Sequence, residues 1–327
     1  MRAIIYDRFG PADEVLSLQD LPVPTPAKGE VLVRLKTSGV NPSDIRARAG
    51  GRPGVTQPPF PQITPHSDGA GVIEAVGKGV SETRIGERVW IRNGQWQRGF
   101  GTAADYIALP ADLAVILPDH ISFEQGAVLG IPALTAVHAV LGGGPVADKT
   151  VLISGGAGTV GRIAVQVAKA SGARVLTTAR PAAHADLAAL GAEVFDYSAP
   201  DLADQILTAT QGALVDRIVE VEFGKNAETN AQVITERGII AAFGSALDMA
   251  PVMPFYPLMF KAVNIDLVLV YLLSAQESET AIKNLTDLLM RDALDLRISD
   301  VLPLEECAKA HDMIATGQRA GSVVLSI

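Results

Sequence analysis

A glycine motif between residues 150 and 180 constrains the fold of this chain more than any other feature. Val151–Ser154 is a short apolar run of the kind that forms a buried strand. Three glycines then make a G-x-G-x-x-G pattern: Gly156, Gly158 and Gly161. An apolar periodicity typical of a helix follows and stops near Gly172, and Val175–Thr178 is a second strand candidate. The sequence therefore predicts a strand, a glycine loop, a helix and a strand in succession.

A loop in this setting binds phosphate well. Glycines let the backbone N–H groups approach a pyrophosphate at the start of a helix, where the helix dipole also favours an anion. The pattern is weak evidence alone, but flanking strand and helix make it much more specific. We expect the loop residues to contact a dinucleotide: Gly156, Ala157, Gly158, Thr159, Val160 and Gly161.

The end of the second strand bears on the choice of dinucleotide. An NAD site usually places Asp or Glu there to accept a hydrogen bond from the ribose 2′-hydroxyl. This chain instead reads Thr177, Thr178, Ala179 and Arg180. The hydroxyl of Thr178 and the guanidinium of Arg180 suit a 2′-phosphate, which favours NADPH over NADH. The alternative is that Arg180 is a solvated loop cation.

Composition narrows the class of protein. With 327 residues, 48% hydrophobic and 19% charged, the chain predicts a soluble globular protein of two domains. A net charge of −9 argues against nucleic acid or an anionic membrane as partner. The first residues lack the apolar core of a signal peptide, and no apolar run is long enough to span a membrane, so we expect a cytoplasmic protein. Cys307 is the one cysteine, which excludes internal disulfides and thiolate-rich zinc sites.

The predicted secondary structure changes character near residue 118. Residues 1–117 contain short strand candidates separated by glycine and proline turns, which is typical of a barrel or sandwich: Glu30–Lys36, Gly71–Val76, Arg88–Ile91 and Tyr106–Leu109. Beyond Pro118, Ser122–Gln125 matches a capping box, and the helix it begins is expected to reach Leu141.

Strands and helices then alternate, which predicts a doubly wound, mostly parallel sheet with Ile265–Tyr271 as an edge strand. The last strand, Ser322–Ile327, is expected to return to the first domain. The predicted domains are thus residues 1–117 with 270–327, and residues 118–269.

Several motifs coincide in order and spacing over essentially the whole chain. They are SGVNPSDIRARAG from Ser38, PHSDGAGVIEAVG from Pro65, FGTAADYIALP from Phe100, PALTAVHAV from Pro132, the glycine loop, LGAEVFDY from Leu190 and the final GSVVL. Through them the chain resembles the medium-chain dehydrogenase/reductase superfamily, and within it the zinc-free quinone oxidoreductases that include zeta-crystallin. The resemblance implies an α/β protein with a GroES-like β-barrel catalytic domain and a Rossmann domain, with the active site in the cleft between them.

The resemblance also bears on zinc. Zinc alcohol dehydrogenases of this superfamily have Cys where this chain has Asn41, and a His–Glu pair where it has Ser67 and Asp68. His66 is one residue out of register. The four-cysteine structural lobe is missing too, and an Asn amide is a poor zinc ligand. We therefore expect no metal.

Without a Lewis acid, conjugated acceptors are easier substrates than simple alcohols and aldehydes. Hydride can add to an enone or a quinone, and hydrogen-bond donors can stabilise the negative charge that develops on oxygen. By resemblance, Asn41 and Asp44 lie beside nicotinamide and substrate, with Asn41 donating from its amide and Asp44 orienting its surroundings. The same residues also suit a turn and a helix N-cap.

The resemblance assigns further residues, each with a structural alternative. Thr135 lies near the carboxamide and Tyr197 near the adenosine phosphate, whereas Phe243, Gly244 and Ser245 follow a strand at the edge where cofactors bind. Arg319 is a further candidate cofactor contact. In the departures from the family pattern, Arg46 stands where many bacterial members have Tyr, and Trp96 occupies an Arg-rich loop with Arg92 and Arg98. Arg46 and Trp96 are candidate substrate contacts, unless the loop is simply packed surface.

The sequence thus predicts an NADPH-dependent, zinc-independent reductase of quinones or α,β-unsaturated carbonyl compounds. A specialised enoyl reductase for one metabolic intermediate is an alternative, motivated by Arg46. A non-catalytic NADPH-binding protein is a third. The apolar strand at Ile265–Tyr271 presents an edge that needs cover, which, with the resemblance, predicts a homodimer.

Overall fold

The computed structural model describes residues 1–51, 54–317 and 320–327. Residue contacts divide the chain into two compact units, Met1–Ile131 with Leu296–Ile327 and Pro132–Asp295. The predicted bounds differ from this division at two places. The segment 118–131 belongs to the first unit, and helix α10 (Ala275–Leu289) belongs to the second, because it packs against α4 (Leu134–Leu141).

The first unit is built around a seven-stranded, mostly antiparallel sheet. Its strands follow the order β14-β15-β3-β4-β5-β7, and β6 also pairs with β3. They are β3 (Glu30–Val40), β4 (Asp68–Val76), β5 (Arg88–Ile91), β6 (Tyr106–Pro110), β7 (Ala114–Ile116), β14 (Ile298–Pro303) and β15 (Ser322–Ser326). A separate hairpin joins β1 (Arg2–Ile5) to β2 (Ser17–Asp20).

Alternating apolar residues make the interior of this sheet. Val31, Val33 and Leu35 of β3 are buried with apolar residues of β4, β5 and β6, while Arg34 and Lys36 face solvent. The last strand does return to this unit, since β15 pairs antiparallel with β3. The register places Ser38 of β3 opposite both Gly69 of β4 and Leu325 of β15.

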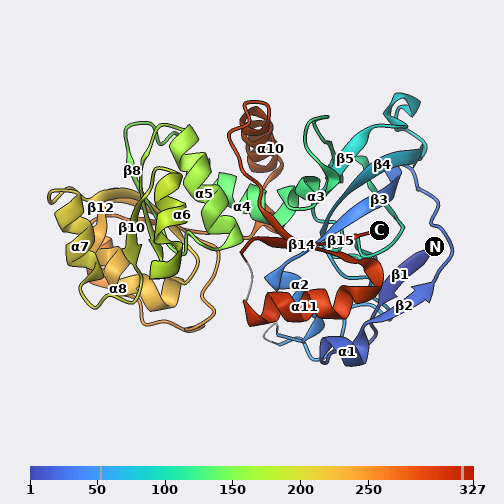
Figure 1. Cartoon of the computed structure of the whole chain (residues 1–327), viewed down its shortest axis with the longest axis horizontal. Helices are drawn as coiled ribbons and strands as arrows, with labels where there is room; N and C mark the ends of the chain where they lie inside the picture. The colour runs from blue at the N-terminus through green and yellow to red at the C-terminus, as the bar shows by residue number, and fades with distance from the viewer. Residues whose placement is uncertain (52–53, 318–319) are drawn as a thin grey trace. The chain divides into compact units, whose positions relative to one another are not determined.

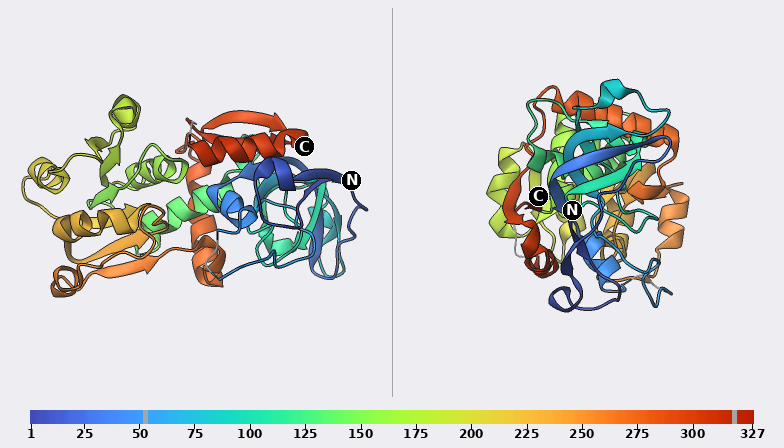
Figure 2. Two further views of the ribbon diagram at one scale, coloured as in Figure 1. Left: turned by 90° about the horizontal axis from the view of Figure 1, so that it is seen from below. Right: turned by 90° about the vertical axis from the view of Figure 1, so that its right-hand side faces the viewer.

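This unit also contains helices. They are α1 (Ala12–Val15), α2 (Pro42–Arg48), α3 (Phe123–Gly126) and α11 (Cys307–Thr316). Of these, α3 and α11 contact strands of the sheet. Helix α11 contacts α1, α2 and β15, so the C-terminal part of the chain packs on its N-terminal part (Figures 1 and 2). This packing buries Cys307, Ala310 and Ile314.

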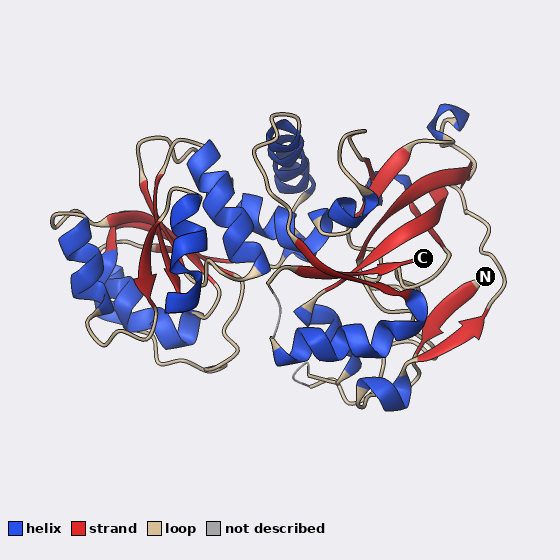
Figure 3. Ribbon diagram, viewed as in Figure 1, coloured by secondary structure: helices blue, strands red, loops and turns tan. Residues whose placement is uncertain are grey.

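The second unit is a parallel sheet of six strands with helices on both sides (Figure 3). The strand order is β10-β9-β8-β11-β12-β13, the order of a doubly wound dinucleotide fold. The strands are β8 (Thr150–Ile153), β9 (Arg174–Ala179), β10 (Glu193–Asp196), β11 (Val215–Glu220), β12 (Ile234–Ala242) and β13 (Asn264–Leu267). Besides α4 and α10, its helices are α5 (Thr159–Ala170), α6 (His184–Ala189), α7 (Leu202–Ala209), α8 (Phe223–Val233) and α9 (Phe255–Phe260).

The expected helix from Ser122 to Leu141 is interrupted. Ser122 and Gln125 do form the capping box that begins α3, but α3 ends at Gly126. A π-helical turn at Leu129–Ala133 separates it from α4. Pro132 lies inside that turn and has no N–H to donate, so a regular helix cannot pass through it.

Candidate functional site

The glycine loop has the predicted form. It leaves β8 at Ser154 and enters α5 at Thr159. Two of its glycines are required by close approach, since a Cβ at Gly161 would collide with the Gly155 carbonyl oxygen and one at Gly156 with the Thr177 hydroxyl. Gly155, with φ of +70°, takes the left-handed conformation that favours glycine. Ala157 and Gly158 are exposed, so the outer surface of the loop is open to a ligand.

Two threonines of β9 hold this loop and the end of β8 in place. The Thr178 hydroxyl accepts a hydrogen bond from Gly155 N–H at 3.1 Å, and its carbonyl accepts from Gly156 N–H at 2.9 Å. Thr177 donates to the Ile153 carbonyl at 2.8 Å. Thr178 is only 5% exposed, and the contacts it makes in this structure hold the loop in place. The N–H groups of the first turn of α5 have no acceptor within the helix and remain suited to an anion.

The other predicted cofactor residues of the second unit follow the carboxyl ends of its strands. Arg180 follows β9 and is exposed, and Tyr197 follows β10 with 53% of its surface exposed. Phe243, Gly244 and Ser245 follow β12. In a sheet of this order, ligands bind where the strand order reverses, here at the ends of β8 and β11.

The turn after β12 is tied to its neighbours. Phe243 N–H donates to the Glu220 carbonyl at the end of β11, and Phe223 N–H at the start of α8 donates to the Gly244 carbonyl, both at 2.9 Å. The Ser245 hydroxyl accepts from Gly224 N–H at 2.9 Å. Thr135 is buried in the first turn of α4. Arg319 lies outside the described residues.

Asn41 and Asp44 meet at the start of α2 in the first unit. Asn41 is the N-cap, and its N–H donates to Asp44 Oδ2 at 2.8 Å. Both residues are 6% exposed. The helix-capping arrangement considered for this sequence is therefore present, and it fixes the Asn41 backbone.

Asp68, which was not among the residues predicted to form the site, joins this pair. It begins β4, is fully buried, and its Oδ2 accepts from Asn41 Nδ2 at 2.9 Å. Ile131 N–H also donates to both carboxyl oxygens, at 2.9 and 3.0 Å. An acid at the head of the apolar strand DGAGVIEAV was the available signal, because a buried carboxyl needs partners.

Burial governs the protonation of these acids. It raises the pKa of Asp44 to about 7, against the opposing effect of the hydrogen bonds from Asn41. It raises the pKa of Asp68 well above its ordinary value, for the same reason. At a pH equal to its raised pKa of about 7, Asp44 is half protonated.

The residues predicted to contact a substrate differ in their exposure and in their contacts. Arg46 is exposed on α2. Trp96 is half-buried, and its backbone N–H donates to the Asn93 carbonyl at 3.1 Å. Arg92 and Arg98 are bound within the same unit. Arg92 lies 3.5 Å from Asp112, and Arg98 donates to the Ala108 carbonyl at 2.6 Å.

The ring nitrogens of His66 form hydrogen bonds with residues other than Asn41. Its Nδ1 lies 2.8 Å from Ser38 Oγ and its Nε2 lies 2.9 Å from His311 Nε2. Both ring nitrogens are thus engaged with residues other than Asn41 and Asp68, in keeping with the one-residue offset from the zinc-ligand position.

No helix of the described segments has the length and apolar character needed to span a membrane. Two family models match the chain. The alcohol dehydrogenase GroES-like domain matches residues 27–119, and the zinc-binding dehydrogenase model matches residues 159–287. They correspond to the barrel-type sheet of the first unit and to most of the parallel sheet of the second.

Relatives match over nearly the whole length. The quinone oxidoreductase of Rattus norvegicus is 32% identical over 99% of this chain and 97% of its own. Among solved structures, an NAD-dependent alcohol dehydrogenase aligns over all of both chains with a TM-score of 0.88 and 29% identity. A mycobacterial protein complexed with NADPH aligns over all of both chains with a TM-score of 0.86 and 28% identity. The chain therefore belongs to the quinone oxidoreductase family of the medium-chain dehydrogenase/reductase superfamily and is an oxidoreductase.

Proposed function

We propose that this protein reduces quinones or α,β-unsaturated carbonyl compounds by hydride transfer from NADPH, without zinc. The observation that carries the proposal is the bond between the Asn41 amide and buried Asp68, at the positions where zinc enzymes of the superfamily hold their metal. Asn41 offers an amide where the zinc enzymes have a thiolate, and Ser67 and Asp68 stand where they have the His–Glu pair. The rat relative's name, quinone oxidoreductase, points to the same substrate class.

The second unit fits a dinucleotide. The loop exposes Ala157 and Gly158 and leads into the first turn of α5, so backbone N–H groups would hold the pyrophosphate. When bound, the reduced nicotinamide supplies the hydride. The side chains after β9, β10 and β12 would bind the remainder, and Arg180 and Tyr197 among them are exposed.

The preference for NADPH rests on the chain's own residues, because the similar structures include one named for NAD and one complexed with NADPH. Arg180 follows β9, where NAD enzymes usually carry an acid. The acid in register on the neighbouring strand, Asp196, accepts hydrogen bonds from the N–H and hydroxyl of Ser198 at 2.9 and 2.7 Å. The cation of Arg180, together with an acid, Asp196, that is already hydrogen-bonded to Ser198, favours binding of a 2′-phosphate.

The first unit would act on the substrate oxygen. The Asn41 amide donates to Asp68 Oδ2 at 2.9 Å and its side chain also bonds to Asp44, which fixes the plane of the amide. A pre-oriented donor of this kind stabilises the charge that develops on oxygen as hydride adds to a conjugated system. Asp44 holds the Asn41 backbone in place. The arginines that motivated a specialised anionic substrate, Arg92 and Arg98, already have partners within their own unit.

The reaction is tested by following reduced nicotinamide oxidation across quinones, enones, enoyl thioesters and simple aldehydes, with and without chelator. We expect turnover of quinones or enones that prefers NADPH and is unchanged by chelator. Turnover of aldehydes that chelator abolishes would contradict the zinc-independent mechanism. NADPH binding without any turnover across the panel would favour the non-catalytic alternative.

Replacement of Arg180 tests the cofactor preference. Arg180→Ala should raise the KM for NADPH by roughly tenfold or more, the effect of losing about 1.5–3 kcal/mol of charge-assisted hydrogen bonding, and leave the KM for NADH unchanged. Arg174→Ala is the matched control, because Arg174 begins the same strand and pairs with Glu193. An equal loss with both cofactors would count against a 2′-phosphate contact.

The pH dependence of turnover tests the role of Asp44, whose pKa is raised to about 7 by burial. As the pH rises through 7, the carboxyl becomes a buried anion that opposes charge on the substrate oxygen. We expect kcat/KM to fall by roughly tenfold, the effect of ~1.4 kcal/mol of repulsion. Asp44→Asn keeps an acceptor for Asn41 N–H and should flatten this profile. A variant with the same inflection as the natural enzyme would assign it to another group.

We also propose a homodimer formed through the β13 edge of the second unit. Strand β13 ends the six-stranded sheet, and Leu267 on it is 74% exposed. Helix α9 adds exposed aromatic residues, with Phe260 at 77%. An apolar strand at a sheet edge invites pairing with an identical strand, and a second copy buries it by two-fold symmetry.

Light scattering tests this assembly. The natural protein should have twice the chain mass of 34.2 kDa at micromolar concentration. Leu267→Lys should weaken the dimer by at least ~tenfold, because a buried Leu is worth about 1.5–3 kcal/mol and Lys protects an edge. Ile116→Lys, at an exposed apolar residue of β7, is the control. A monomer of the natural protein would reject the proposal.

A further inference from the structure

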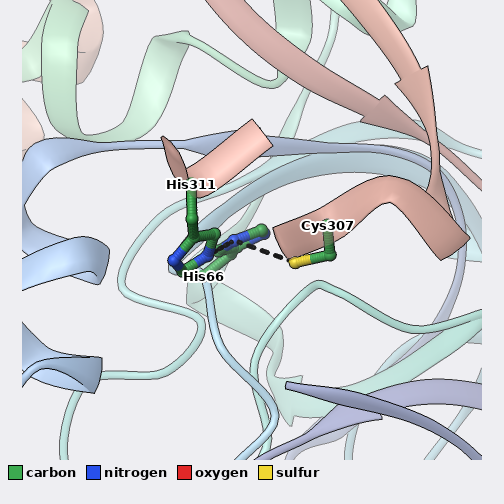
Figure 4. Close-up of side chains that lie close together, drawn as sticks. All are labelled: His66, Cys307 and His311. Carbon is green, nitrogen blue, oxygen red and sulfur yellow. Dashed lines mark hydrogen bonds between the residues drawn. The ribbon is translucent and has the colours of Figure 1, made fainter. Parts of the chain in front are cut away.

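A second polar cluster lies in the interior of the first unit and has no part in the proposed chemistry so far. His66 precedes β4, whereas Cys307 and His311 lie one turn apart on α11 (Figure 4). None of the three is more than 1% exposed. One nitrogen or sulfur atom from each falls within 4.8 Å of the others.

The two histidine rings meet head-on. Their Nε2 atoms are 2.9 Å apart, and their ring centroids are 5.1 Å apart. The difference is close to two imidazole radii, so each nitrogen points nearly along the line to the other. That geometry is a hydrogen bond between rings, in which one Nε2 carries the proton and the other accepts.

Arg48 decides which ring donates. It is the last residue of α2, and its Nε–H points to His311 Nδ1 at 3.3 Å. A guanidinium can only donate, so His311 Nδ1 accepts and His311 carries its proton on Nε2. His311 therefore donates to His66 Nε2, and His66 carries its own proton on Nδ1.

The same logic continues beyond His66. Its Nδ1–H donates to Ser38 Oγ at 2.8 Å, and the Ser38 hydroxyl donates to Thr102 Oγ1 at 2.8 Å. The Thr102 hydroxyl then donates to the Asp68 backbone carbonyl at 2.5 Å. Each group accepts from one neighbour and donates to the next, so the chain has one consistent direction from Arg48 to Asp68.

Both rings must be neutral for this arrangement. A second proton on His66 would place N–H against N–H in the ring pair. Burial lowers the pKa of His66 to about 3, and burial together with His66 and Arg48 lowers the pKa of His311 well below its ordinary value. Burial also raises the pKa of the Cys307 thiol, so that group is neutral too.

The chain ends on the residue that holds the candidate donor. The carboxyl of Asp68 binds the Asn41 amide, and Asn41 begins the helix that Arg48 ends. We propose that His311 and His66 form a directional hydrogen-bond relay that positions Asp68, and through it Asn41, for reaction with the substrate. Both histidines are positioning residues, and their effect on turnover rests on the proposed role of Asn41.

A bound metal is the competing explanation of the cluster. Two imidazoles and a thiolate are a ligand set that Zn²⁺ and Cu⁺ accept. Ligation through His311 Nε2 would, however, move its proton to Nδ1, against the Arg48 donor. The head-on rings also direct their nitrogens at each other rather than at a common third point. The observations therefore favour the relay.

Histidine tautomers provide the direct test, since the chain has five histidines and selective ¹⁵N labelling resolves them. We expect His311 protonated on Nε2 and His66 on Nδ1, both neutral, in the natural protein. The opposite tautomers, or an imidazolium, would overturn the relay. Added Co²⁺ should give no thiolate charge-transfer band; a band lost in Cys307→Ala would assign the cluster to a metal instead. Neither readout requires turnover, so both stand even if the proposed reaction fails.

Kinetics of three variants test the positioning role. His311→Leu leaves His66 Nε2 and Arg48 without their partner, and should lower kcat by about tenfold with the KM for NADPH unchanged. His311→Gln can still donate to His66 and should recover most of that loss. Lys309→Ala is the control, because Lys309 is exposed on the same helix and forms an ion pair with Glu306, and it should match the natural enzyme. A folded His311→Leu protein with natural kcat would reject the positioning role.

Discussion

The buried carboxyl of Asp68 is the interaction on which the arrangement of the first unit depends. It joins the start of β4 to the Asn41 amide and to the N–H of Ile131. The surroundings are built to admit it, because a Cβ at Gly130 would collide with its Oδ1. A buried carboxyl is costly unless its oxygens are bonded. Here the same bonds that lower that cost fix the side chain proposed to meet the substrate.

In the second unit, backbone N–H groups rather than side chains are proposed to meet the ligand. Its loop must expose N–H groups toward a ligand and still be rigid. Glycines supply the close approach, Thr178 ties the loop to β9, and Thr177 joins β9 to the end of β8. Thr178 is a predicted cofactor contact from the sequence, yet its hydroxyl oxygen already accepts a hydrogen bond from Gly155 N–H. Recognition of a 2′-phosphate would then depend mainly on Arg180, the exposed residue that follows.

Local patterns predicted the features that depend on neighbouring residues. Alternation located β3, the turn residues that separate short strands located β5, and the capping box located the start of α3. The break at Pro132 was overlooked because the apolar pattern runs through it. Strand β14 was also missed, since it is an edge strand with polar residues and a terminal proline.

The polar interior was harder to predict because its partners are distant in sequence. His66 meets His311 across 245 residues, and Arg48 meets His311 across 263. A lone histidine beside a glycine turn gives no sign of such a pair. The unfavourable conformation of His66, with φ of +76°, is equally invisible in the sequence, although it is where the chain must turn to aim the ring inward.

Protonation of these buried groups makes the stability of the folded state depend on pH in two opposite ways. The neutral histidines favour the folded state above their unfolded pKa near ~6.5, and that stability is lost as the pH falls toward the folded value of about 3 for His66. Asp44 acts in the other direction, because its raised pKa destabilises the fold as the pH rises from its unfolded value near ~3.9 to about 7. The two effects oppose each other between these limits. Between about pH 3 and about pH 7, His66 is neutral and Asp44 is mostly protonated. In that range the developing charge on a substrate oxygen would meet oriented neutral dipoles of these two residues.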